Sequence, residues 1–280
     1  AVSNGTVELL NGSTLAPVAP ALKVMSGTGA AESAAFSPDG RLLATGADDG
    51  SVRLFDVSDP AHPRQLTVVR KAGNTDQILT VLFAPDGREL AASSASTSSV
   101  QLWRLTSGDG LVPAGPDLGG MASYPIGLAF TPDGRTLAIG NSDNHVYLWN
   151  MARPGRPRRL GPPLAGPSGQ TWSVAVSPDG RTLAAGVNDG TVWLWNLADP
   201  AHPALSATLS GLPGHIFSIA FSPGGAQLAA ASFDDDTVRL WDTSPAAAQA
   251  AVCANLGQRL SPVEWATYLP GVPYRAPCSG

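Results

Sequence analysis

The chain has 280 residues, of which 43% are hydrophobic, and its net charge is −5. Charges of both signs are mixed along it, and no stretch has the density of Lys and Arg that nucleic-acid binding requires, so we expect no nucleic-acid partner for this region. No apolar run approaches the roughly 18–20 residues that cross a bilayer, so we expect no membrane contact by this region either.

The chain begins with the pattern of a single strand. Residues 4–11 read Asn-Gly-Thr-Val-Glu-Leu-Leu-Asn, a turn followed by alternating polar and apolar residues. No strands precede it that would complete a sheet. We therefore expect residues 1–19 to form an incomplete unit, and the chain to be the C-terminal portion of a longer protein joined to further upstream domains. Residues 20–26 are expected to supply the outer strand of the next unit.

One pattern then occurs five times: an apolar pair, Ser-Pro-Asp-Gly, Arg-x-Leu-Ala, and Asp-Gly-x-Val-x-Leu-Trp. The copies recur about every 45 residues, and a period of that size is typical of an array of equivalent supersecondary units. The five copies are Phe36–Asp56, Phe83–Arg104, Phe130–Asn150, Val176–Asn196 and Phe221–Asp242.

Each copy predicts a set of antiparallel strands. In the first copy, residues 34–37 and 42–46 read as buried strands, and Pro38-Asp39-Gly40 between them reads as a hairpin turn. A second turn at 48–50 precedes the alternating strand 51–55, and 65–69 reads as a fourth, outermost strand. Four strands per ~45 residues indicate one blade of a β-propeller, so the predicted fold class is all-β.

The repeated pattern resembles the WD40-repeat family. The resemblance rests on Trp-Asp at 241–242, Trp-Asn at 149–150 and 195–196, and Gly-His at 214–215. It covers about residues 1–244 and implies a propeller of four-stranded antiparallel blades, with five full blades and a partial one in this chain and seven in the usual ring. The expected repeats span about 20–58, 59–106, 107–151, 152–198 and 199–244.

The resemblance also implies a hydrogen-bond network of Trp, Ser/Thr, Asp and His within each blade. No copy holds all four residue types, so we expect the network to contribute only partially. We interpret its members as structural, because they recur and a catalytic residue is needed once. They are Trp103, Trp149, Trp195 and Trp241; Asp49, Asp143, Asp189 and Asp235; and His215.

Residues 245–280 are expected to form a helical C-terminal cap. An Ala-rich stretch is followed by Ser261-Pro262-Val263-Glu264, a capping box that predicts a second short helix. Cys253 and Cys278 flank this helix and are expected to form a disulfide, with two free thiols as the alternative. A disulfide favours an extracytoplasmic location, and free thiols favour the cytoplasm. The tail also resembles the C-terminus of large bacterial multidomain WD40 regulatory proteins.

The sequence lacks the common motifs of catalysis. It has no G-x-x-x-x-G-K-[ST] phosphate loop, no H-E-x-x-H and no G-x-S-x-G, so we expect no catalytic residues, no cofactor and no metal site.

Recognition is expected where the copies differ, near the start of each innermost strand. Aromatic residues and Arg are favoured interface anchors, although Trp and Phe here can equally pack between blades. The candidate partner-binding residues are Arg70, Lys71, Gln77, Tyr124, Trp172 and Phe217. The leading hypothesis is a non-catalytic protein-interaction scaffold, as the C-terminal sensor or interaction module of a larger bacterial signalling protein. The alternatives are a small-ligand sensor that uses the axial channel and, less favoured, a propeller hydrolase or lyase.

Overall fold

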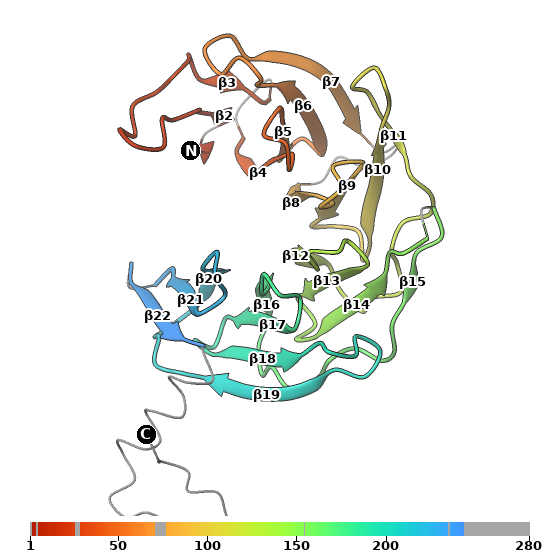
Figure 1. Cartoon of the computed structure of the whole chain (residues 1–280), viewed down its shortest axis with the longest axis vertical. Helices are drawn as coiled ribbons and strands as arrows, with labels where there is room; N and C mark the ends of the chain where they lie inside the picture. The colour runs from red at the N-terminus through yellow and green to blue at the C-terminus, as the bar shows by residue number, and fades with distance from the viewer. Residues whose placement is uncertain are drawn as a thin grey trace, which may run out of the picture.

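The computed structural model describes residues 2–3, 5–25, 29–70, 77–153, 155–234 and 236–243. These residues form six antiparallel sheets in which strands that follow one another in sequence pair side by side. The sheets succeed one another around an arc, with one innermost strand per repeat near the centre (Figure 1). The all-β fold with four-stranded antiparallel blades is thereby confirmed.

The first sheet has three short strands, β1 (Val2–Ser3), β2 (Thr6–Val7) and β3 (Leu22–Lys23). Strand β3 pairs with β2, through Thr6 opposite Lys23 and Val7 opposite Leu22. The expectation that residues 20–26 form the outer strand of the first full blade is therefore wrong. That position is taken by β7, which follows the third strand of the second sheet and pairs with it.

Four sheets of four strands follow. The second sheet comprises β4 (Ala31–Phe36), β5 (Leu42–Ala47), β6 (Ser51–Asp56) and β7 (Arg64–Arg70). The third comprises β8 (Ile78–Phe83), β9 (Glu89–Ser94), β10 (Val100–Leu105) and β11 (Leu111–Pro113). The fourth comprises β12 (Pro125–Phe130), β13 (Thr136–Asn141), β14 (Val146–Asn150) and β15 (Arg158–Arg159). The fifth comprises β16 (Thr171–Val176), β17 (Thr182–Val187), β18 (Val192–Asn196) and β19 (Ala204–Leu209).

The sixth sheet has three strands within the described residues, β20 (Ile216–Phe221), β21 (Gln227–Ser232) and β22 (Val238–Asp242). The described part of the chain contains no helix. The predicted helical cap at 245–280, with Cys253 and Cys278, lies outside the described residues, as do Lys71 and Asp235.

The Ser-Pro-Asp-Gly motif closes the turn between the first two strands of a sheet. Ser37 Oγ donates to Asp39 Oδ1 at 2.5 Å and accepts from the backbone N–H of Leu42 at 2.8 Å. Gly40 has a φ of 69°, in the left-handed region that glycine adopts without a steric cost. The equivalent glycines have φ between 69° and 72°, so each repeat makes the same turn: Gly87, Gly134, Gly180 and Gly225.

The core lies between neighbouring sheets rather than inside any one of them. On β14, for example, Trp149 packs in the cluster shared with the third sheet, and Leu148 packs in the cluster shared with the fifth. Alternation along a strand places these side chains on opposite faces, so a sheet with a neighbour on each side is buried on both faces. Full burial of one such Leu contributes about 1.5–3 kcal/mol. Val238 and Leu240 on β22 are 66% and 61% exposed, because no further sheet among the described residues packs on them.

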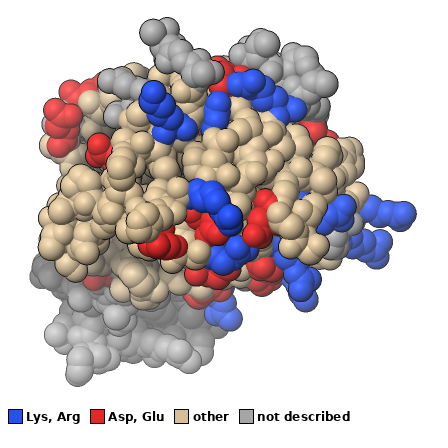
Figure 2. Space-filling view, turned by 90° about the horizontal axis from the view of Figure 1, so that it is seen from above, with Lys and Arg blue, Asp and Glu red and all other residues tan. Residues whose placement is uncertain are grey.

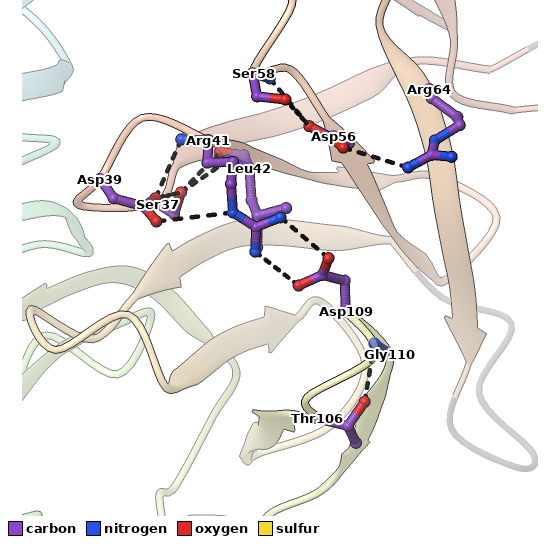
Figure 3. A network of polar contacts seen from close by, with 10 residues as sticks. All are labelled: Ser37, Asp39, Arg41, Leu42, Asp56, Ser58, Arg64, Thr106, Asp109 and Gly110. Atoms are coloured by element: carbon purple, nitrogen blue, oxygen red, sulfur yellow. Dashed lines mark hydrogen bonds and ion pairs between the residues drawn. The ribbon is translucent and has the colours of Figure 1, made fainter.

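Polar contacts also join neighbouring sheets. Along the axis, Ser33 Oγ accepts from the N–H of Val81 at 3.1 Å. A second contact joins two turns: Arg41, in the turn before β5 of the second sheet, donates to the Asp109 carboxylate, in the turn before β11 of the third sheet (Figure 3). On the side of the molecule seen in Figure 2, basic and acidic side chains lie close together near the centre, and no continuous basic stripe crosses it.

Candidate functional site

The innermost strands share one irregularity, a shift in register at their second residue. In β8 the pairing with β9 steps from Ile78 to Thr80 and passes over Leu79, and β4, β16 and β20 make the same one-residue step. In β12 the step runs from Pro125 to Leu128 and passes over both Ile126 and Gly127. Such a β-bulge bends the strand and re-aims the side chain at the bulge. The residues at these positions are Glu32, Leu79, Ile126, Trp172 and Phe217, and we call them the bulge ring.

The five residues of the bulge ring line a single cavity. Its volume is about 230 Å³. The residues that follow the bulges form its next layer and include Ser33, Thr80, Gly127 and Ser173. A Cβ at Gly127 would lie 3.0 Å from the carbonyl oxygen of Trp172, so glycine allows the fourth and fifth sheets to approach closely beside the cavity. The cavity is thus a feature of the axis, built from several sheets at once.

Aromatic rings border one side of the cavity. The ring centroids of Trp172 and Phe217 are 5.9 Å apart, and Trp172 also lies 6.4 Å from the His215 ring. Phe233 continues the cluster at 6.3 Å from Phe217. Phe217 and Phe233 are 58% and 70% exposed. We call these four residues the aromatic cluster, and the end of the sheets where the innermost strands begin the first-strand face.

A carboxyl group lies on the same cavity. Glu32 remains exposed, but its partial burial raises its pKa, and the hydrogen bond to the Asp48 carboxyl and the charge of that carboxyl raise the pKa further. Asp48 itself accepts from the Ala30 N–H at 2.7 Å and from Gln77 Nε2 at 2.9 Å. Among the described residues no basic side chain forms an ion pair with Glu32. Within the described part of the chain, the cavity therefore combines aromatic faces with a carboxyl group that has no basic partner.

The structure brings only some of the predicted partner-binding residues together. Trp172 and Phe217 share the cavity, whereas Gln77 does not line it and is hydrogen-bonded to Asp48. Arg70 forms an ion pair with Asp49 within its own sheet. Tyr124 is half-buried, and its carbonyl accepts from Ser142. Lys71 lies outside the described residues.

Three of the aspartates predicted to be structural, Asp49, Asp143 and Asp189, lie in the turns between the second and third strands. Asp49 accepts from the N–H of Ser51 at 3.1 Å and from Arg53 at 3.1 Å. Burial opposes ionisation of Asp49, but the hydrogen bonds from Ser51 and Arg53 outweigh it and lower its pKa to about 2. Asp143 accepts from the Tyr147 hydroxyl at 2.5 Å, and Asp189 accepts from the Thr191 N–H at 3.0 Å.

The tryptophans of the pattern serve packing rather than hydrogen bonding. Trp103, Trp149 and Trp195 are buried, and Trp241 is half-buried. Among the described residues, Nε1 of Trp103 and Nε1 of Trp149 have no hydrogen-bond partner, so their blades lack the Trp end of the network. His215 lies at the surface, where its N–H donates to Asp234 Oδ2 at 2.9 Å and its ring borders Trp172.

The sequence interpretation missed Glu32, Leu79, Ile126 and Phe233. In the structure the buried residues of β8 are Ile78, Val81 and Phe83, spaced by three and then two positions, but the sequence Ile-Leu-Thr-Val-Leu-Phe does not reveal this spacing. A regular strand would space them by two. Phe233 stands at the turn position that Asp48 and Ser142 occupy in other copies. No rule of residue spacing marks it as a binding residue.

Two further observations on the described residues concern metals and membranes. No group of three His, Cys, Asp or Glu side chains among them is arranged to hold a metal ion. No helix in this part of the chain is long and apolar enough to cross a membrane.

Comparison with known proteins identifies the repeats. The family model described as "WD domain, G-beta repeat" matches residues 21–56, 121–150, 162–196 and 206–242. The small ribosomal subunit protein RACK1 of Neurospora crassa is 32% identical over 127 residues, which cover 44% of this chain and 38% of that protein. The guanine nucleotide-binding protein subunit beta of Arabidopsis thaliana is 28% identical over 114 residues, which cover 41% of this chain and 30% of that protein.

A human relative, WD repeat and SOCS box-containing protein 1, is 28% identical over 116 residues. These residues cover 41% of this chain and 26% of that protein. The chain therefore aligns with well under half the length of each of these curated relatives.

Proposed function

Since the chain belongs to the WD40-repeat family, we propose that it is a non-catalytic protein-interaction platform whose first-strand face binds a protein partner. The exposed aromatic cluster at the mouth of the axial cavity carries this proposal. Aromatic side chains dominate the energetics of interfaces, and Phe217 and Phe233 expose more than half of their surface beside one another. The named relatives, a ribosomal subunit protein and a G-protein subunit, are members of larger assemblies by their names.

The proposal includes a place as the C-terminal interaction module of a larger bacterial signalling protein. The resemblance of the tail at 245–280 supports this context, whereas the relatives reported above are eukaryotic and support only the repeat family.

The small-ligand alternative has less support. Pockets that enclose drug-sized ligands have volumes of roughly 300–1,000 Å³, and the axial cavity measures about 230 Å³. A cavity of that size suits one side chain of a partner better than a whole metabolite. The hydrolase alternative needs convergent acid, base and nucleophile groups, and the bulge ring supplies one carboxyl among apolar residues.

A capture experiment tests the proposed function. The full chain is immobilised, proteins from the source organism are captured, and recovery is quantified for the wild type and for the F217A/F233A variant. We expect the double substitution to reduce recovery of the specific partner about tenfold or more. The control is L205A, since Leu205 is a similarly exposed apolar residue (54%) on the outermost strand β19. Equal recovery by both variants and the wild type would refute the assignment of this face.

A further inference from the structure

We propose that the axial cavity receives one basic side chain, Lys or Arg, from the protein partner, held between the Glu32 carboxylate and the rings of Trp172 and Phe217. This inference rests on the proposed function, because the side chain belongs to a segment docked on the first-strand face. It assigns the cavity a chemical preference, for a cationic side chain.

The first step of the argument is the composition of the bulge ring. One member is acidic, two are aliphatic and two are aromatic, and all five line the same space. Lys and Arg side chains likewise combine an apolar part and a charged part, since each has an apolar stem and a charged head. Leu79 and Ile126 provide apolar surface for the stem, and the carboxylate and the rings provide partners for the head.

The second step concerns charge. Partial burial and the Asp48 carboxyl beside it raise the pKa of Glu32, so the empty cavity disfavours negative charge on this group. A neutral apolar occupant would deprive the carboxylate of water without giving it a partner, which is costly. An acidic occupant would be repelled. Of the common side chains, only a cationic one relieves the repulsion between the Glu32 and Asp48 carboxyl groups.

The third step concerns the aromatic side of the cavity. The faces of Trp and Phe attract cations within about 6 Å of the ring centroid. Trp172 and Phe217 are inclined at 42° with centroids 5.9 Å apart, so they form an angled pair of walls. The Trp172 Nε1–H donates to Gln170 at 3.2 Å, which fixes the indole. Among the described residues, the only cation–π contacts are those of Arg159 on Tyr147 and Arg239 on Trp241, so no described Arg or Lys occupies either wall.

The test uses short peptides and the full chain. Acetylated, amidated pentapeptides Gly-Gly-X-Gly-Gly, with X as arginine, lysine, citrulline or norleucine, are titrated into ¹⁵N-labelled protein. The indole N–H signal of Trp172, assigned with W172F, reports binding. We expect the arginine and lysine peptides to shift this signal, and the citrulline and norleucine peptides to bind at least fivefold more weakly.

Variants separate the charge from the shape of the cavity. E32Q is expected to weaken binding of the arginine peptide about five- to tenfold, and E32K to abolish it, whereas L205A leaves it unchanged. Glu32 is exposed at its strand position, so both substitutions are compatible with folding, which the dispersion of the remaining indole signals checks. Equal binding of neutral and basic peptides, no effect of E32Q, or no shift with any peptide would each overturn the inference.

The two proposals fail in different ways. If F217A/F233A abolishes partner recovery while E32Q leaves peptide binding unchanged, the platform stands and the basic-side-chain inference is wrong. If the peptides bind as expected while partner recovery is insensitive to the aromatic cluster, the proposed face is wrong, and with it the idea that the basic group comes from that partner.

Discussion

Arg41 and Asp109, 68 positions apart in the sequence, form a two-pronged ion pair that joins the second sheet to the third, with nitrogen–oxygen distances of 3.0 and 2.7 Å. Both belong to turns, Arg41 after the Ser-Pro-Asp-Gly motif and Asp109 before β11 (Figure 3). Asp109 has a φ of 57°, a left-handed conformation that Asp and Asn tolerate better than most residues. The ion pair therefore depends on turn geometry at both ends.

This pair predicts a modest, salt-dependent coupling between the two sheets. In a double-mutant cycle of R41M and D109N, measured by urea unfolding, we expect a coupling of about 0.5–1 kcal/mol, because the pair is bidentate but partly exposed. Asn keeps the backbone conformation at 109 accessible, so the cycle isolates the charge. The coupling should shrink in 1 M salt. A coupling that is zero at low salt would show that the pair does not contribute.

Asp49 predicts a loss of stability in acid. Its pKa is about 2 in the folded protein and 3.8 in the unfolded reference, so the stability that it contributes is present above pH 4 and is lost as the pH falls from about 4 to about 2. We expect D49N to cost about 1–2 kcal/mol at pH 7, after allowance for solvent screening, and much less at pH 2. Unfolding curves across this range test the prediction. The control is D59N, which removes an exposed Asp59–His62 pair.

Gly140 predicts a steric limit on how closely the sheets pack. A Cβ there would lie 2.9 Å from both the Cγ2 and the carbonyl oxygen of Thr171 on the next sheet. We expect G140A to destabilise the protein by about 1–3 kcal/mol, since the neighbouring backbone has to shift. G224A is the matched control, because a Cβ at Gly224 meets nothing within 4 Å. Thermal unfolding of the two variants should separate them clearly, and equal midpoints would contradict the packing argument.

Glu32 predicts opposite effects on stability and on binding. Because its pKa is raised in the folded state, its ionisation disfavours folding, and this cost is present at pH 7 and vanishes as the pH falls below about 4. E32Q should therefore raise the unfolding midpoint at pH 7 and leave it unchanged at pH 3.5, while it weakens the peptide binding described above. A residue with only a structural role would be expected to lower the midpoint when replaced.

Local chemistry determined which features could be predicted from the sequence. The turn glycines were predictable, because Pro-Asp-Gly requires a positive φ at its last residue, and Gly40 and its equivalents have one. The pairing of β3 with β2 was not predictable, because a two-residue strand carries no sequence pattern that selects its neighbouring strand. Trp172 and Phe217 were candidates by residue type, whereas Glu32 was missed because its role depends on a register shift that brings it to the same cavity as residues about 140 and 185 positions away.

The register shifts have a wider consequence for how such a protein can change. On either side of each bulge, the innermost strand keeps its ladder with the second strand, so the bulged residue itself is released from the demands of sheet pairing. The same backbone can then present a different set of five side chains to the axis without rebuilding a single sheet. Relatives that share the turns and the buried tryptophans are free to diverge at these five positions, and a designer who wishes to redirect recognition needs to alter little else.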